Sequence, residues 1–128
     1  MATVPQQLDA MLQLQENWDG YGADTIHASI VELAKEFLSF FARLEQSSGI
    51  ALNVRVYPTR VGGVQIEWEE RTAEWELELN PDGSLGLLHI DKESGAMREE
   101  TFQPGRSAVA VGLLTRLGEM TGAASVVA

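Results

Sequence analysis

Two neighbouring runs of alternating apolar and polar residues constrain the fold of this 128-residue chain more than any other feature. They cover residues 64–69 (VQIEWE) and 74–79 (EWELEL), and residues 70–73 between them suit the connection of a β-hairpin. Alternation with a period of two is typical of a strand with one buried face. Each run holds one tryptophan, and pairing Trp68 with Trp75 fixes the register. Apolar side chains then share one face of the hairpin, and polar side chains share the other.

In that register the outer face of the hairpin carries five carboxylates, namely Glu67, Glu69, Glu74, Glu76 and Glu78. Like charges that face each other across a sheet destabilise it. A basic neighbouring strand, a bound cation or a basic partner could offset that cost. Arg55, on the preceding predicted strand, could neutralise Glu67. The five carboxylates are therefore candidate partner-binding residues, and a solvated acidic surface is the simpler alternative.

Two helices are predicted before the strands. Pro5 suits the start of a short helix near residues 5–16. A long amphipathic helix is predicted near residues 27–46, and Gly49 is a typical residue just after a helix end. Its apolar residues recur at helical spacing, at Ile30, Leu33, Ala34, Phe37, Leu38, Phe41 and Leu44. We expect Phe37, Leu38 and Phe41 to pack on the apolar face of the sheet.

The remaining strands and the fold class follow from alternation and turn signals. Strands are predicted at residues 52–57, 64–69, 74–79 and 85–91, with a weaker fifth strand at 97–102. Short connections between them predict an antiparallel meander of four or five strands. Helices gathered before and after the meander make the fold class α+β.

The end of the chain is predicted to form one more helix. Ser107 can cap a helix that carries Leu113, Leu114 and Leu117, although Gly112 weakens it. Residues 122–128 lack charge and periodicity, so we expect them to fray. Residues 1–121 are then one α+β domain, because no linker or internal repeat divides them.

The net charge of −10 excludes several partners. Residues 61–100 hold eleven Asp and Glu against three Lys and Arg, so most of the excess lies on the predicted sheet. Such a surface repels phosphate, which argues against nucleic acid and anionic membranes. It favours a protein partner with a basic surface and leaves a homo-oligomer open. The polar residues 1–16 do not resemble a signal peptide, so we expect a cytoplasmic protein.

The segment of residues 17–24 (NWDGYGAD) is a second candidate binding site. Its glycines allow tight turns, and Trp18, Asp19 and Tyr21 could contact a partner. In the alternative interpretation, which we favour, Trp18 and Tyr21 fill the gap between the two helices. Asp19 or Asp24 would then cap the second helix.

Two motifs resemble those of a family of small bacterial proteins. Its members share an N-W-D-G-Y-G-A loop and a G-G-[VI]-Q-[IL]-E-W strand, which correspond here to residues 17–23 and 62–68. The resemblance covers roughly residues 12–80. It implies a bacterial origin and an intact domain, but it supplies no catalytic residue. Many of these proteins have a proline after the loop, whereas this chain has residues 24–28 (DTIHA), which leaves the start of the second helix open.

Catalytic patterns are weak in this chain. It has no cysteine, no phosphate-binding glycine loop, and only His27 and His89 as imidazole bases. His89 and Asp91 share one strand face and could ligate a metal, but no third ligand can be named. The sequence therefore predicts a non-catalytic acidic protein-binding module without a cofactor. An antitoxin, immunity or inhibitor role, or an accessory role in a defence or phage system, suits such a chain. The alternative is a divalent-metal-dependent enzyme that uses the Glu-rich face.

Overall fold

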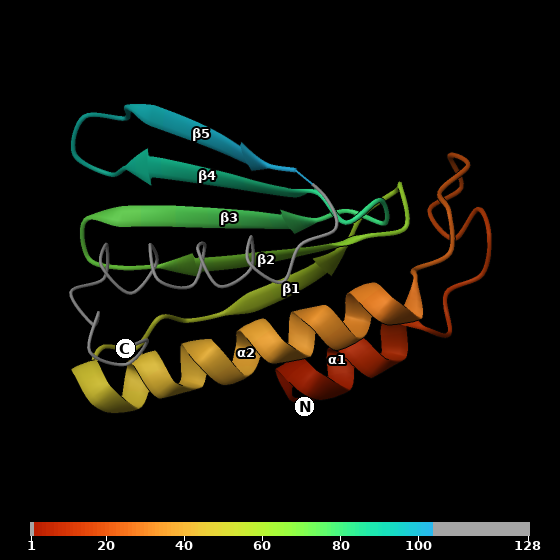
Figure 1. Ribbon diagram of the computed structural model, residues 1–128, viewed down its shortest axis with the longest axis horizontal. Coiled ribbons are helices and arrows are strands. Elements are labelled where there is room, and N and C mark those ends of the chain that lie inside the picture. Colours follow the sequence, from red (N-terminus) through yellow and green to blue (C-terminus); the bar gives the residue numbers. More distant parts are fainter. Residues whose placement is uncertain (1, 104–128) are drawn as a thin grey trace.

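The computed structural model of the protein describes residues 2–103, and its fold is α+β (Figure 1). Two helices precede five strands: α1 (Val4–Met11), α2 (Ala28–Ser48), β1 (Arg55–Pro58), β2 (Val64–Glu69), β3 (Ala73–Leu79), β4 (Leu85–Asp91) and β5 (Met97–Phe102). The strands are hydrogen-bonded in chain order, and every neighbouring pair is antiparallel. The predicted meander is confirmed with five strands. The helix predicted from Ser107 and the tail at residues 122–128 lie outside the described residues.

The register predicted for the central hairpin is confirmed. Trp68 lies opposite Trp75, and Glu67 lies opposite Glu76. Burial alternates along both strands, because every second side chain points toward the helices. The buried side of the sheet is called the inner face below, and the opposite side is called the outer face.

Helices α1 and α2 cover only part of the inner face. Helix α1 packs on α2 and β1, and α2 packs on β2 and β3. In Figure 1 both helices lie on the β1 side of the sheet, and β4 and β5 lie on the far side. The core between helices and sheet is apolar, and its largest fully buried side chains are Trp68, Phe37, Phe40, Phe41, Leu8, Leu44, Leu52, Ile66, Leu77 and Leu79.

Helix α2 buries a wider arc than its sequence pattern predicts. Phe37 and Phe41 are buried as expected, and Leu38 packs against the core but is only half-buried, so its burial is less complete than predicted. Val31 and Phe40 are buried instead. The physical reason is that α2 contacts α1 as well as the sheet, so two neighbours shield adjacent sectors of the helix surface.

Two element boundaries also differ from the predictions. Helix α1 ends at Met11 rather than near residue 16, and the turn that follows closes through hydrogen bonds between residues three apart, such as Leu14 N–H to the Met11 carbonyl. Strand β1 begins at Arg55 rather than at residue 52, because Asn53 has a positive φ of 52° that interrupts the extended backbone. Within residues 2–103, no helix is both long and apolar enough to cross a membrane.

Candidate functional site

The five carboxylates predicted to share one face do so in the structure. The pairs Glu67 with Glu76 and Glu69 with Glu74 are direct cross-strand neighbours, and Glu78 faces the amide side chain of Gln65. Among the described residues, no helix contacts the outer face of β3, because α2 packs on its buried side. The carboxylates nevertheless fall into two groups with different surroundings.

Glu67 is neutralised by its own sheet. Arg55 lies opposite it on β1, and the guanidinium Nη2 is 3.8 Å from Glu67 Oε1. The side-chain amide of Gln65 donates a hydrogen bond of 2.7 Å to Glu67 Oε2. The predicted pairing of Arg55 with Glu67 is therefore confirmed, and Glu67 belongs to the charge network of the fold.

Glu69 is neutralised by residues farther along the chain. Lys92 Nζ lies 3.0 Å from Glu69 Oε2, and Asn53 Nδ2 donates to Glu69 Oε1 over 3.2 Å. The hydrogen bond from Lys92 is the main reason that the pKa of Glu69 lies below its ordinary value, followed by the bond from Asn53. Glu69 therefore also has partners within the chain.

The other three carboxylates form a row along β3 that we call the acidic row: Glu74, Glu76 and Glu78. Within residues 2–103, none of the three has an ion pair or a side-chain hydrogen bond. Partial burial raises the pKa of Glu76, and the charges of Glu67, Glu78 and Glu74 raise it further. The acidic row thus carries repulsion that the described part of the chain does not neutralise.

Apolar side chains lie beside the acidic row on the same face. Leu88 is opposite Glu76 across β3 and β4, and Ile90 is opposite Glu74. Met97 on β5 pairs with Ile90 and is 61 % exposed. The doublet Leu87-Leu88 is the sequence signal for this arrangement, because alternation sends one leucine to each face. Sequence analysis did not identify these three residues as part of the site.

The outer face is not flat where it passes Gly86. A hollow of about 220 Å³ lies there, and its lining includes Glu76, Glu78, Leu88, Glu99 and Thr101. Gly86 is opposite Glu78 on one side and Thr101 on the other. The hollow forms because Gly86, which has no side chain, lies between two strands whose facing residues carry side chains.

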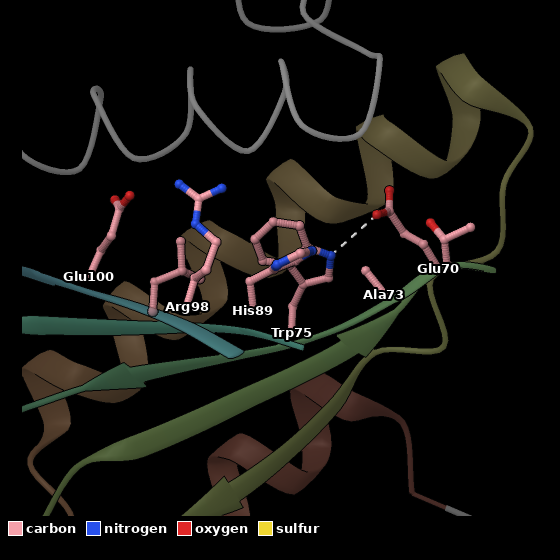
Figure 2. A pocket seen from close by; sticks show the side chains of 8 residues that line it. Glu70, Ala73, Trp75, His89, Arg98 and Glu100 are labelled. Atoms are coloured by element: carbon pink, nitrogen blue, oxygen red, sulfur yellow. Dashed lines mark hydrogen bonds between the residues drawn. The ribbon is translucent and has the colours of Figure 1, made fainter. Parts of the chain in front are cut away.

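A second hollow lies on the inner face, where β3, β4 and β5 meet (Figure 2). It has a volume of about 210 Å³, and the rings of Trp75 and His89 form its base with centroids 4.4 Å apart. Glu70 lies on one side and accepts a hydrogen bond of 3.2 Å from Trp75 Nε1, and Arg98 lies beside His89 (Figure 2). Acidic and basic side chains both line this hollow, whereas the charged side chains that line the hollow at Gly86 are all acidic.

The structure does not support a metal site at His89 and Asp91. Both residues lie on the inner-face side of β4, as their spacing predicts. However, Asp91 Oδ1 accepts the backbone N–H groups of Ser94 and Glu93, which lower its pKa, and so stabilises the turn into β5. Within residues 2–103, no three His, Cys, Asp or Glu side chains are grouped so that they could hold a metal ion.

Trp18 has the structural role that we favoured from the sequence. Its ring is half-buried against the core, and Nε1 donates a hydrogen bond of 2.8 Å to the Asp24 carbonyl. Tyr21 is different: its side chain is 79 % exposed, so the expectation that it fills the gap between the helices is wrong. The chain turns sharply at Gly20 and Gly22, both with positive φ, and this carries Tyr21 away from the core.

Asp19 stabilises the loop rather than helix α2. Asp19 Oδ1 accepts the backbone N–H groups of Tyr21 and Ala23, and Oδ2 lies 2.9 Å from Arg60 Nε. Partial burial opposes the charged form, but these hydrogen bonds and the Arg60 charge outweigh it and lower the pKa of Asp19. Helix α2 instead begins after His27, which makes no side-chain capping bond, so the expected cap by Asp19 or Asp24 is wrong.

The turn between β1 and β2 anchors this loop and explains the two neighbouring glycines. The Gly62 carbonyl accepts the His27 N–H, and a Cβ at Gly62 would lie 2.7 Å from the Thr25 carbonyl oxygen. A Cβ at Gly63 would lie 2.2 Å from the Leu79 carbonyl oxygen. The segments of residues 17–24 and 60–63 therefore form one structural unit, and their side chains chiefly hold the fold together.

Comparisons with known proteins do not add a function to this geometry. No protein-family model matches the chain, and comparisons with curated proteins and with solved structures gave no match either. The choice among the surfaces therefore rests on their physical chemistry. The outer face combines three neighbouring carboxylates that have no cationic partner within residues 2–103 with the half-buried Leu88 and Ile90 and the exposed Met97.

Proposed function

We propose that this protein acts by binding, and that the outer face of β3 to β5 docks a protein partner with a basic surface. The observation that carries the proposal is the acidic row. Glu74, Glu76 and Glu78 lie in line on one strand without a cationic partner in the described part of the chain. A basic partner would supply the missing neutralisation.

The composition of the surface supports a protein as the partner. Interfaces combine a desolvated apolar centre with polar groups around it. Leu88, Ile90 and Met97 offer apolar contact directly beside the carboxylates. Electrostatic complementarity of this kind speeds association and disfavours partners of the wrong charge. Phosphate-bearing partners are disfavoured by the same surface.

A small acidic protein that covers a basic surface can block the activity of that partner. We therefore assign the protein to the class of accessory factors that includes antitoxins, immunity proteins and inhibitors, with a role in a bacterial defence or phage-related system. This assignment depends on the charge of the outer face and on the size of the chain. It involves no catalytic residue and no cofactor.

The proposal can be tested with a fluorescently labelled peptide of ten lysines as a defined basic probe. We expect the peptide to bind the protein and to perturb backbone NMR signals mainly along β3 and β4. Added salt should weaken binding, because exposed charges are screened over about 10 Å at 0.1 M ionic strength. The triple variant Glu74→Gln, Glu76→Gln and Glu78→Gln should bind much less.

A second triple variant controls for net charge. Glu16, Glu36 and Glu93 are exposed and make no ion pair with any residue in the range 2–103. Replacing them with glutamine changes the net charge from −10 by +3 to −7, as the first triple does. We expect this control to bind the peptide nearly as well as the unmodified protein. Equal losses in the two triple variants would contradict the proposal, because binding would then follow net charge alone.

A further inference from the structure

We infer that the hollow at Gly86 receives a lysine or arginine side chain of the partner. The inference rests on the proposed function, because it assigns the basic group of the partner to one place on the outer face. The inference also goes beyond charge complementarity, since it requires that the basic side chain enters the hollow rather than lies on the surface. The basic head group would lie among the carboxylates of the hollow, and its alkyl chain would lie on Leu88.

The shape and charge of the hollow suit one basic side chain. Carboxylates reach it from both sides, with Glu76 and Glu78 on β3 and Glu99 on β5. Leu88 is opposite both Glu76 and Glu99, so an apolar surface lies between the charges. Long basic side chains commonly rest their methylene groups on apolar surface and keep the charged end beside polar groups. The volume of about 220 Å³ is below the range of about 300–1,000 Å³ typical of small-molecule sites.

Neither the backbone nor the packing requires glycine at position 86. Gly86 is not among the glycines with positive φ. A Cβ built there would meet only atoms of Glu78, at 3.9 Å, which is an ordinary van der Waals contact. Glycine in a strand interior weakens the strand, because it has no side chain to pack. Gly86 thus weakens strand β4 without a local structural reason. Its missing side chain leaves the space of the hollow open.

The apolar neighbours extend the expected contact along β4. Ile90 lies two residues beyond Leu88 on the same face and pairs with the exposed Met97. A partner segment that places a basic side chain at Gly86 could rest an apolar side chain on Ile90 and Met97. The occupant is therefore a basic segment, and an apolar residue next to its basic side chain would add contact with Ile90 and Met97.

The test fills the hollow without changing any charge. Gly86→Leu should weaken binding of the ten-lysine peptide by about fivefold or more, and Gly86→Ala should have a smaller effect. Ala42→Leu adds the same kind of bulk on the exposed side of α2 and should leave binding unchanged. A ten-residue peptide of diaminopropionic acid carries its amines on shorter side chains, which extend less far into the hollow than lysine side chains do. It should bind the unmodified protein more weakly than the lysine peptide and should be insensitive to Gly86→Leu.

The outcomes separate this inference from the proposed function. If Gly86→Leu binds the lysine peptide like the unmodified protein, while the Glu74, Glu76 and Glu78 triple variant does not, the hollow is unused and only the inference is overturned. If the lysine peptide fails to bind the unmodified protein, both are overturned. Thr101→Leu narrows the same hollow from β5 and leaves β4 unchanged in sequence. Near-ultraviolet circular dichroism shows whether both leucine variants keep the native fold. If both are native and both lose binding of the lysine peptide, the inference is supported even where Gly86→Leu shifts β4 slightly.

Discussion

The indole rings of Trp68 and Trp75 lie parallel, with 2° between their planes and 5.9 Å between their centroids. They are direct cross-strand partners one residue pair away from the end of the hairpin nearest its turn, and both are buried. Slipping the hairpin by one residue would turn one of the two tryptophans to the outer face. This contact therefore holds the register that places all five glutamates on one surface.

Replacing Trp68 tests how much stability that contact provides. Trp68→Ala should lower the free energy of unfolding by about 3–5 kcal/mol, because the ring is fully buried and also lies against Phe41. Trp68→Phe should cost clearly less. It keeps an aromatic ring and removes an indole N–H that has no hydrogen-bond partner among residues 2–103. Denaturant melts measure both values, and equal losses would show that the ring stack is not what stabilises the hairpin.

Helix α2 provides a matched pair of core substitutions. Phe37 is 2 % exposed, so Phe37→Ala should cost about 3–5 kcal/mol. Leu38 is half-buried, and Leu38→Ala should cost markedly less. Urea unfolding of the two variants checks the rotation of the helix. A loss for Leu38→Ala as large as that for Phe37→Ala would contradict the half-buried position of Leu38.

Much of the fold could be predicted from the sequence because local patterns determine it. The register follows from alternation and from one tryptophan in each run, and α2 ends at Gly49, which has the expected left-handed conformation. The buried arc of α2 could not be predicted, because it depends on where α1 packs. The position of α1 is set by contacts between segments that are far apart in sequence, and local patterns do not encode such contacts.

The candidate site was only partly predictable for the same reason. Sequence alternation puts the five glutamates on one face, but only the structure shows that Lys92 neutralises Glu69 and that Glu74 has no such partner in the described part of the chain. The hollow at Gly86 depends on the register of three strands at once. The conformation of the loop around Tyr21 also involves Arg60, whose guanidinium donates a hydrogen bond to the Tyr21 carbonyl across 39 residues of sequence.

The loop of residues 17–24 gives a contrast between two aromatic residues. Trp18→Ala should lower the melting temperature, since it removes packing on the core and the hydrogen bond to the Asp24 carbonyl. Tyr21→Ala should leave the melting temperature nearly unchanged, because the side chain is 79 % exposed. Differential scanning calorimetry of the two variants is the measurement. Unaltered stability in Trp18→Ala would return that residue to the list of binding candidates.

The acidic row should give stability a pH dependence of a defined sign. The pKa of Glu76 is higher in the folded protein than its ordinary value of 4.5, so the folded state holds this proton more tightly. Ionisation of Glu76 therefore lowers the free energy of unfolding as the pH rises from 4.5 through the raised pKa. Glu76→Gln should be more stable than the unmodified protein at pH 7, and this gain should vanish as the pH falls to 4.5 and below.

Glu69 should behave in the opposite way and serves as the control. Its pKa is lowered by Lys92 and Asn53, so its stabilising effect is present above its ordinary pKa and is lost as the pH falls through the folded value. Glu69→Gln should thus be less stable than the unmodified protein at pH 7. Free energies of unfolding measured between pH 3 and pH 8 give the sign of the stability change for both variants. A Glu69→Gln variant that is more stable than the unmodified protein at pH 7 would contradict the ion pair with Lys92.

The most direct test of the account is the stability of the free protein without its acidic row. If Glu74, Glu76 and Glu78 are kept for a partner rather than for the fold, replacing all three with glutamine at low ionic strength should raise the free energy of unfolding by about 0.5–1 kcal/mol. The control triple at Glu16, Glu36 and Glu93 should change it by no more than about 0.5 kcal/mol. A clear loss of stability in the acidic-row variant alone would show that these carboxylates hold the fold together, and would contradict their assignment as a docking surface.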